Sequence, residues 1–198
     1  MEKLFAILQS IGPMSPELIS WLRKHLRRRH YKAGETILTI GQICRDICFI
    51  ESGLIRIYHN GEKGQETNWL QKENEIFISI NSFFSQTPSF ESIQALEDCM
   101  VWSITHADLA EACRLFPEFN LHQDKIKTLY YEIKNKRDAQ MKGLPPRERY
   151  LYFLTEEPEI MARTPVDPLA SWLQMSSKTL FKIRKDLWND RKKTPNQQ

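Results

Sequence analysis

The feature that most constrains the fold is a long segment without helix breakers. Between Pro117 and Gly143 the sequence has no glycine or proline, which predicts one continuous helix over residues 117–142. At 1.5 Å per residue this helix extends about 39 Å, too long for a simple connector. Either a partner helix in a second subunit covers its apolar stripe, or the helix packs on its own domain. The stripe consists of Phe119, Ile126, Leu129, Tyr130, Ile133 and Met141.

Before this helix the pattern is typical of short β-strands. From His30 to about Ile104, runs rich in β-branched and aromatic residues alternate with turn signals. Within "HNGEKG", Asn60 and Gly61 accept the backbone angles that a hairpin tip requires. Closely spaced strands of this kind predict an antiparallel sandwich or barrel. The expected strands lie in "ETILTIG", "ICFIES", "GLIRIYHN", "QETNWLQ", "IFISI" and "SIQALEDCMVWSI".

Helices are expected on both sides of the strands. The basic run "RKHLRRRH", Arg23 to His30, is interpreted as the end of an N-terminal helix, where cations are favoured. "THADLAEACRLFP" opens with a capping residue and acidic positions, which predicts a helix that stops near Pro117. A first amphipathic helix is expected from the spacing of Leu4, Phe5, Ile7, Leu8 and Ile11.

A boundary is expected at "GLPP", residues 143–146, because glycine ends helices and proline begins them. Short helices should follow at about Arg147–Thr155 and Pro158–Arg163. The polar segment "NDRKKTPNQQ" at the end of the sequence is expected to be disordered. Residues 164–198 carry a net charge of +4, whereas residues 1–163 carry −1. The basic excess near the C-terminus favours a polyanionic partner for that region.

The segment "LASWLQMSSKTLFKIRKDL", Leu169 to Leu187, predicts two short helices separated by a tight turn. Ser176 or Ser177 can cap the second helix. At 100° per residue, an apolar side and a cationic side face opposite ways. The apolar side holds Leu180, Ile183 and Leu187, and the cationic side holds Lys178, Lys182 and Lys185. A helix that enters the major groove needs this arrangement, although many surface helices carry lysines only for solubility.

The order of these segments resembles one known family. An N-terminal helix, "AGETILTIGQICRDICFIESGLIRIY", a long helix, a hinge and "PVDPLASWLQMSSKTLFKIRKDL" together are similar to the Crp/Fnr (catabolite-activator-like) transcription regulators. The similarity extends from about Met14 to Leu187. "ICRDICFIESGLIRIYH" and "ESIQALED" look most like the small regulators of Bacteroidetes-type bacteria.

The resemblance implies an α+β architecture with three parts. Residues 1–116 would form a cyclic-nucleotide-binding-like β-roll, or jelly roll, with flanking helices. Residues 117–142 would form a long dimerisation helix. Residues 143–198 would form a helix-turn-helix DNA-binding domain with a disordered tail. The family binds palindromic double-stranded DNA as a homodimer.

The pocket segment departs from the family pattern. Where the family's nucleotide-binding members carry a Glu and an Arg, this sequence has Ser79 and Ser89 or Phe90. No Lys or Arg occurs between Lys72 and Arg114, so a buried cyclic phosphate would lack charge compensation. Cyclic AMP is therefore not the expected ligand. The region either is filled core or holds an unknown small-molecule effector among Trp69, Phe77, Ser79, Phe83, Phe84, Ser89 and Phe90.

The second helix of the proposed helix-turn-helix also departs from the family. Ser177 and Lys178 replace an Arg-Glu pair, which removes an acceptor for cytosine and predicts a different target sequence. Phe181 and Gln174 occupy positions that are usually small or glycine, and no β-hairpin wing is evident. The expected DNA contacts are Ser177, Lys178, Thr179 and Lys182 at base edges, and Arg184 and Lys185 nearer the backbone.

Other function classes lack support in the sequence. The five histidines show no HxH or HExxH spacing, and no GxSxG, P-loop or GxGxxG motif occurs. No enzyme activity, metal site or cofactor is expected. The cysteines are expected to be buried and structural, in a reducing cytoplasm. No apolar run is long enough for a membrane span.

Two functions remain open from the sequence. The first is a cytoplasmic DNA-binding transcription regulator of the Crp/Fnr type that does not respond to cyclic AMP. The second is a ligand-sensing or protein-interaction module with the same fold that has lost specific DNA binding.

Overall fold

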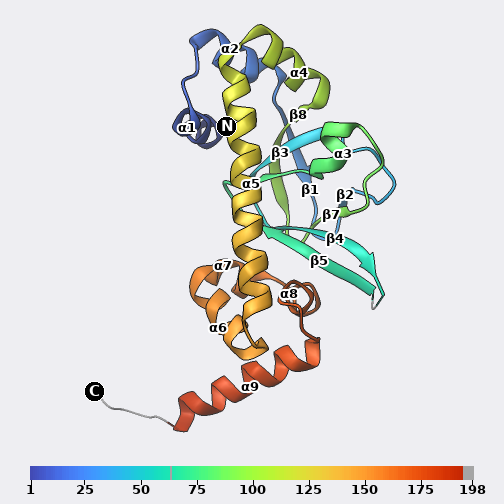
Figure 1. The fold of residues 1–198 in the computed structure, drawn as a ribbon, viewed down its shortest axis with the longest axis vertical. Coiled ribbons are helices and arrows are strands. Elements are labelled where there is room, and N and C mark those ends of the chain that lie inside the picture. The colour runs from blue at the N-terminus through green and yellow to red at the C-terminus, as the bar shows by residue number, and fades with distance from the viewer. Residues whose placement is uncertain (63, 194–198) are drawn as a thin grey trace, which may run out of the picture.

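The computed structural model describes residues 1–62 and 64–193, and it has the expected α+β architecture (Figure 1). The helices are α1 (Glu2–Ile11), α2 (Pro16–His25), α3 (Ile80–Ser85), α4 (His106–Leu115), α5 (Glu118–Gly143), α6 (Pro146–Glu156), α7 (Pro158–Arg163), α8 (Val166–Trp172) and α9 (Ser177–Lys193). The strands are β1 (Arg27–Tyr31), β2 (Thr36–Leu38), β3 (Asp46–Ser52), β4 (Ile55–Gly61), β5 (Gly64–Gln71), β6 (Ile76–Phe77), β7 (Ser92–Ala95) and β8 (Cys99–Thr105).

The strands form two antiparallel sheets with the orders β1-β8-β3-β6 and β2-β7-β4-β5. Alternating residues of each strand face the space between the sheets. Ile50 and Val101 pair across the first sheet, and Ile57 and Ile93 pair across the second; all four are almost completely buried. The expected double-sheet jelly roll is confirmed.

The basic run near the N-terminus is divided between two elements, which corrects the interpretation as a helix end. Arg23 lies in the last turn of α2, which ends at His25. The residues from Arg27 onward form β1, which pairs with β8 through contacts such as Arg29 with Val101. Pairing with a central strand satisfies the backbone groups of this charged segment, and its long side chains remain at the surface.

The long helix α5 runs from the region of α2 and α4 to the C-terminal helices (Figure 1), and its apolar stripe is divided. Phe119 and Met141 are buried, at opposite ends of the helix. Tyr130 packs on the core of the roll. Leu129 and Ile133 are 46% and 58% exposed. One side of α5 therefore packs on the roll, and another part of its apolar stripe is uncovered.

The helices after α5 share a second hydrophobic core. It contains residues from α6 to α9 together with Leu54 and Leu70 of the roll. The β4–β5 hairpin lies against α8 (Figure 1), and the backbone N–H of Thr67 donates to Ser171 Oγ at 2.8 Å. The roll and the C-terminal helices thus contact each other through apolar and polar groups.

Several smaller expectations are corrected or fall outside the described residues. "IFISI" is a strand only at Ile76–Phe77, and α3 begins at Ile80. The helix α9 continues to Lys193, so the first part of the segment expected to be disordered is helical. Residues 194–198 and Lys63 of the hairpin tip lie outside the described residues.

Cys44, Cys48 and Cys99 are buried, and Cys113 is partly buried. None of the helices in residues 1–62 and 64–193 is long and apolar enough to cross a membrane.

Candidate functional site

The turn between α8 and α9 depends on a glutamine with an uncommon backbone conformation. Gln174 has a φ of 53°, in the left-handed region that normally favours glycine. Its N–H donates to Ser171 O at 2.9 Å, and the N–H of Met175 donates to Ala170 O at 3.0 Å. These bonds cap α8, so Gln174 retains the turn that a glycine would make, at a cost of about 1 kcal/mol.

The start of α9 is fixed by hydroxyl groups. Ser176 Oγ accepts from the N–H of Thr179 at 3.0 Å, as an N-cap residue does. Ser176 Oγ also lies 2.8 Å from Thr179 Oγ1. Ser177 Oγ donates to Asp167 Oδ1 at 2.6 Å, which ties α9 to the first turn of α8. The hydroxyls of Ser177 and Thr179, both expected DNA contacts, are therefore already engaged within the chain.

A buried arginine stabilises this turn through hydrogen bonds to its backbone carbonyls. Arg149 of α6 donates from Nη1 to the carbonyls of Leu173 and Gln174, at 2.6 and 3.2 Å, and from Nη2 to Leu144 O at 2.9 Å. It joins the end of α5 to the α8–α9 turn. Arg149 was not predicted from the sequence, because its three backbone acceptors lie in distant segments and produce no local pattern.

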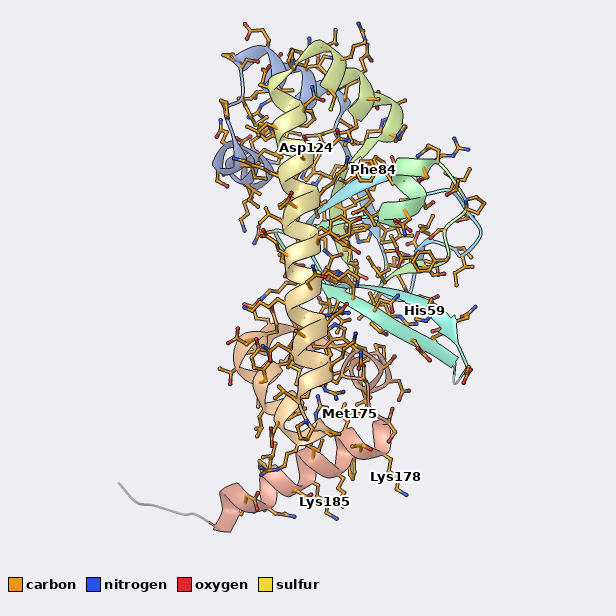
Figure 2. The ribbon with its side chains drawn as sticks, viewed as in Figure 1. His59, Phe84, Asp124, Met175, Lys178 and Lys185 are labelled. Carbon is orange, nitrogen blue, oxygen red and sulfur yellow. The ribbon has the colours of Figure 1, made fainter. Side chains whose placement is uncertain are left out.

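The two sides of α9 have opposite character. Leu180 and Ile183 are 0% and 7% exposed and belong to the second core. Lys178, Lys182 and Lys185 are exposed on the other side, and Figure 2 shows Lys178 and Lys185 pointing away from the molecule. No residue in the described part of the chain forms an ion pair with these three lysines. Their ammonium groups are free to meet a polyanion.

Arg184 differs from the three lysines. Its side chain is partly buried, and its guanidinium lies 5.9 Å from the centre of the Tyr150 ring in α6. It stabilises the packing of α9 on α6, and the expectation that it faces a DNA backbone has less geometric support than for Lys185.

Two large apolar side chains share the outer side of α9 with the lysines. Phe181 and Trp188 are 68% and 60% exposed. Because they are seven residues apart, they lie on one face, and Lys192 Nζ is 5.2 Å from the Trp188 ring. Trp188 was missed in the sequence analysis, although this spacing from Phe181 is visible in the sequence.

A cavity of about 460 Å³ lies between the roll and α5. It is lined by β4 and β5, the start of α3, the segment around Phe90, the part of α5 from Tyr130 to Asp138, and Gln174 of the α8–α9 turn. The roll contributes Ile57, Asn68, Trp69 and Glu91, and α5 contributes Tyr130, Lys134 and Arg137. A second, apolar groove of about 520 Å³ also follows α5 and includes Leu129 and Ile133. It shares Trp69, Tyr130 and Arg137 with the first cavity.

Most of the expected pocket residues do not line this cavity. Phe77 and Phe83 are 2% and 0% exposed and fill the core of the roll. Phe84 lines the apolar groove instead, where Lys127 Nζ lies 4.2 Å from its ring centre. Phe77 and Phe83 therefore agree with the filled-core alternative, whereas an effector pocket among the remaining residues stays a prediction.

The two serines at the family's Glu and Arg positions are also buried. Ser79 Oγ and Ser89 Oγ lie 2.9 Å apart, so each satisfies the other. Phe90 is 58% exposed and lies at the mouth of the cavity. Of the seven expected residues, Trp69 and Phe90 line the cavity.

The charged groups of the cavity were missed in the sequence analysis. Arg137 comes from α5, outside the segment between Lys72 and Arg114 that lacks cations, and Glu91 follows Phe90. Burial lowers the pKa of Arg137 and raises that of Glu91. The signal was present: Arg137 is seven residues after Tyr130 and therefore lies on the inward stripe of the helix.

No cluster of metal-binding side chains accompanies these groups. Within the described residues, no three His, Cys, Asp or Glu side chains are close enough to hold a metal ion. The cavity offers hydrogen-bond donors, aromatic faces and one arginine, which is the chemistry of a binding site for a small organic molecule.

Comparison with known proteins agrees with this architecture. Residues 28–115 match the family model for the cyclic nucleotide-binding domain, which spans the roll from β1 to α4. Comparison with curated protein sequences gives no match.

Solved structures resemble almost the whole chain. FixK2 from Bradyrhizobium japonicum has a TM-score of 0.71 and 13% identity, over 83% of this chain and 85% of that chain. The c-di-GMP responsive global regulator CLP from Xanthomonas campestris has a TM-score of 0.70 and 17% identity, with 89% and 93% coverage. The catabolite activator protein of Thermus thermophilus has a TM-score of 0.54 and 20% identity, with 89% and 85% coverage. These likenesses establish the fold.

Proposed function

We propose that this protein is a homodimeric, DNA-binding transcription regulator of the Crp/Fnr type. The observation that carries the proposal is the exposed cationic side of α9, on which Lys178, Lys182 and Lys185 surround Phe181. The buried leucine and isoleucine beneath hold the helix in place. A helix with this division presents its outer side to the major groove, where lysines contact phosphates or base edges. In this role α8 and α9 act as a helix-turn-helix, and the protein acts in the cytoplasm.

A second copy of the chain is the natural partner for the exposed strip on α5. Leu129 and Ile133 adjoin the 520 Å³ apolar groove, and burying such a strip favours association. A twofold dimer presents two α9 helices, so the target is a palindrome with half-sites about one helical turn apart. An effector bound beside α5 would change the separation of the two reading helices.

Cyclic AMP is not the proposed effector. Where the family's nucleotide-binding members carry a Glu and an Arg, the roll has Ser79 and Ser89, which are buried and lie within hydrogen-bond distance of each other. A buried phosphodiester needs a cationic side chain that donates two hydrogen bonds to it, and the roll has no Lys or Arg between Lys72 and Arg114.

The experiment is selection of bound duplexes from a random DNA pool, followed by affinity measurements on the enriched site. The variant Lys178→Ala with Lys182→Ala should lose at least about tenfold in affinity, and the salt slope should fall by about 2. The control is Lys3→Ala with Lys24→Ala, which removes the same charge from exposed positions at the other end of the molecule. It should bind DNA like the wild type.

Two outcomes contradict the proposal. If the lysine double variant binds as tightly as the control, α9 is not the reading helix. If no palindrome is enriched, the protein is a ligand-sensing or interaction module that has kept the fold without specific DNA binding. The engaged hydroxyls of Ser177 and Thr179 are the observation that favours this second function.

A further inference from the structure

Arg137 brings a charged group into the cavity between the roll and α5. Its side chain is only 16% exposed. Its Nε and Nη1 atoms are buried, and within the described residues neither has a hydrogen-bond partner. Leaving buried donors unpaired is unfavourable, and more so for a charged group. A guanidinium in this state is a strong candidate for binding a ligand.

The acidic residues around the cavity do not satisfy Arg137. Asp138 Oδ1 lies 3.8 Å from Arg137 Nη2, beyond hydrogen-bond distance. Asp138 instead accepts from Lys134 Nζ at 2.7 Å, one turn away on the same helix. Glu91 belongs to the roll, and burial raises the pKa of its carboxyl group. The Nε and Nη1 donors of Arg137 thus remain available to a molecule in the cavity.

An aromatic surface adjoins these donors. The Arg137 guanidinium lies 4.8 Å from the centre of the Trp69 ring, and the Tyr130 ring stands edge-on to Trp69 at 5.3 Å. The Trp69 Nε1 atom is also buried without a partner in the described chain. Flat apolar groups stack on such a surface, and the free donors beside it call for an acceptor-rich, anionic group.

We propose that this cavity binds a small planar aromatic carboxylate. The carboxylate accepts two parallel N–H···O bonds from Arg137, one from Nη2 and one from either Nε or Nη1. The ring of the ligand stacks beside Trp69 and Tyr130. A volume of about 460 Å³ accommodates a molecule of this size. That the ligand regulates DNA binding rests on the proposed function, whereas the binding itself depends only on the cavity.

The position of the cation distinguishes this site from a cyclic-nucleotide site. Here the cation comes from α5, whereas the family's nucleotide-binding members carry it in the roll. The anion-binding group belongs to α5, the helix that also carries the exposed apolar strip. A bound carboxylate therefore fixes a side chain of α5 directly, and its charge contacts the helix rather than the roll.

The test measures binding to the full chain in the absence of DNA, so failure of the DNA-binding proposal does not affect it. The probes are 2-naphthoate and its neutral isostere 2-naphthamide, in calorimetry and thermal unfolding. The wild type should prefer the carboxylate by about tenfold or more. The preference should fall to near one in Arg137→Gln and be intermediate in Arg137→Lys, which keeps the charge without the fork. Arg114→Gln, an exposed control, should leave the preference unchanged.

Three results would overturn the inference. The first is equal affinity of the wild type for naphthoate and naphthamide. The second is an unchanged preference in Arg137→Gln. The third is binding of cyclic AMP more tightly than naphthoate, which would assign the cavity to nucleotides. If Arg137→Gln fails to fold, the wild-type preference and the Arg137→Lys variant still decide the question.

Discussion

Arg163 and Glu73 form a bidentate ion pair between the C-terminal helices and the roll. Arg163 Nη1 and Nη2 each donate to one Glu73 oxygen at 2.8 Å. Glu73 also accepts from the N–H of Gly53 at 2.8 Å, and Arg163 donates to Glu97. Hydrogen bonds from Arg163 lower the pKa of Glu73 to about 2. The two halves of the molecule are therefore joined by an oriented charge network in addition to the shared apolar core.

Removing this pair should destabilise the whole chain. In a double-mutant cycle of Arg163→Met and Glu73→Gln, we expect a coupling free energy of about 1–3 kcal/mol, measured by urea unfolding at pH 7. The coupling should disappear as the pH falls from 4.5 toward 2, because protonation of Glu73 removes the carboxylate. The exposed pair Arg114 and Glu111 is the control, expected below about 0.5 kcal/mol. Equal coupling in the two pairs would contradict this interpretation.

Glu75 should make the unfolding free energy fall as the pH rises, which is opposite to the effect of Glu73. Burial, followed by repulsion from Glu157, raises the pKa of Glu75 to about 7. The folded chain then binds the proton more tightly than the unfolded chain, so the unfolding free energy falls as the pH rises from about 4.5 to 7.

The variant Glu75→Gln should remove this dependence. At pH 8 it should be more stable than the wild type by at most about 3 kcal/mol, and at pH 4.5 the two should be nearly equal. Denaturant unfolding at both pH values measures the difference, with the exposed Glu132→Gln as the control. Parallel pH profiles for wild type and Glu75→Gln would show that Glu75 is not responsible.

Charges on the exposed strip of α5 should dissociate the proposed dimer. The wild type should have about twice the chain mass of 23.4 kDa in sedimentation or light scattering. Leu129→Lys with Ile133→Lys should give a monomer, because two ammonium groups cannot be buried in an apolar interface without partners. Leu115→Lys, which replaces a comparably exposed leucine on α4, should stay dimeric. A monomeric wild type would exclude this interface.

Phe181 should recognise thymine, if α9 enters the major groove as proposed. Its exposed ring lies among the lysines and can contact the thymine methyl group. Replacing thymine with deoxyuridine in the selected site should weaken wild-type binding by about 1 kcal/mol and have no effect on Phe181→Ala. The salt slope should be the same for both proteins, since Phe181 carries no charge. An equal loss in wild type and variant would rule out this contact.

Gly53 should tolerate no side chain. Its φ is +105°, and a Cβ atom would lie 2.5 Å from Cys99 Sγ and 2.8 Å from Asp98 O. We expect Gly53→Ala to destabilise the protein by about 2 kcal/mol or more in thermal or denaturant unfolding. Gly143→Ala meets nothing within 4 Å and should be neutral or slightly stabilising. A neutral Gly53→Ala would mean that the turn can shift.

Periodicity predicted most of the fold, because helices and strands leave a regular pattern of apolar residues. The long helix, the cap at Thr105 and the break at Pro146 follow from local chemistry. The strand β1 was not predicted, because Arg27–Tyr31 has no apolar alternation and depends on pairing with β8.

The candidate site was predicted less completely, because its residues come from distant segments. The exposure of Lys178, Lys182 and Lys185 followed from helical spacing alone. The cavity depends instead on the packing of α5 against β5, which brings Arg137 to Trp69. The spacing of Arg137 from Tyr130 places it on the inward side of α5, but no local pattern shows which strand it meets, so the sequence did not identify Arg137 as a cavity residue.

The leucines that the roll contributes to the second core determine when that core can be completed during synthesis. Leu54 and Leu70 are synthesised long before α6 to α9, yet they belong to the hydrophobic core that those helices form. Until Leu180 and Ile183 of α9 leave the ribosome, the core around both side chains is incomplete, and a stalled chain would be prone to aggregation there. The newly made C-terminal helices then complete their folding on a surface that already exists.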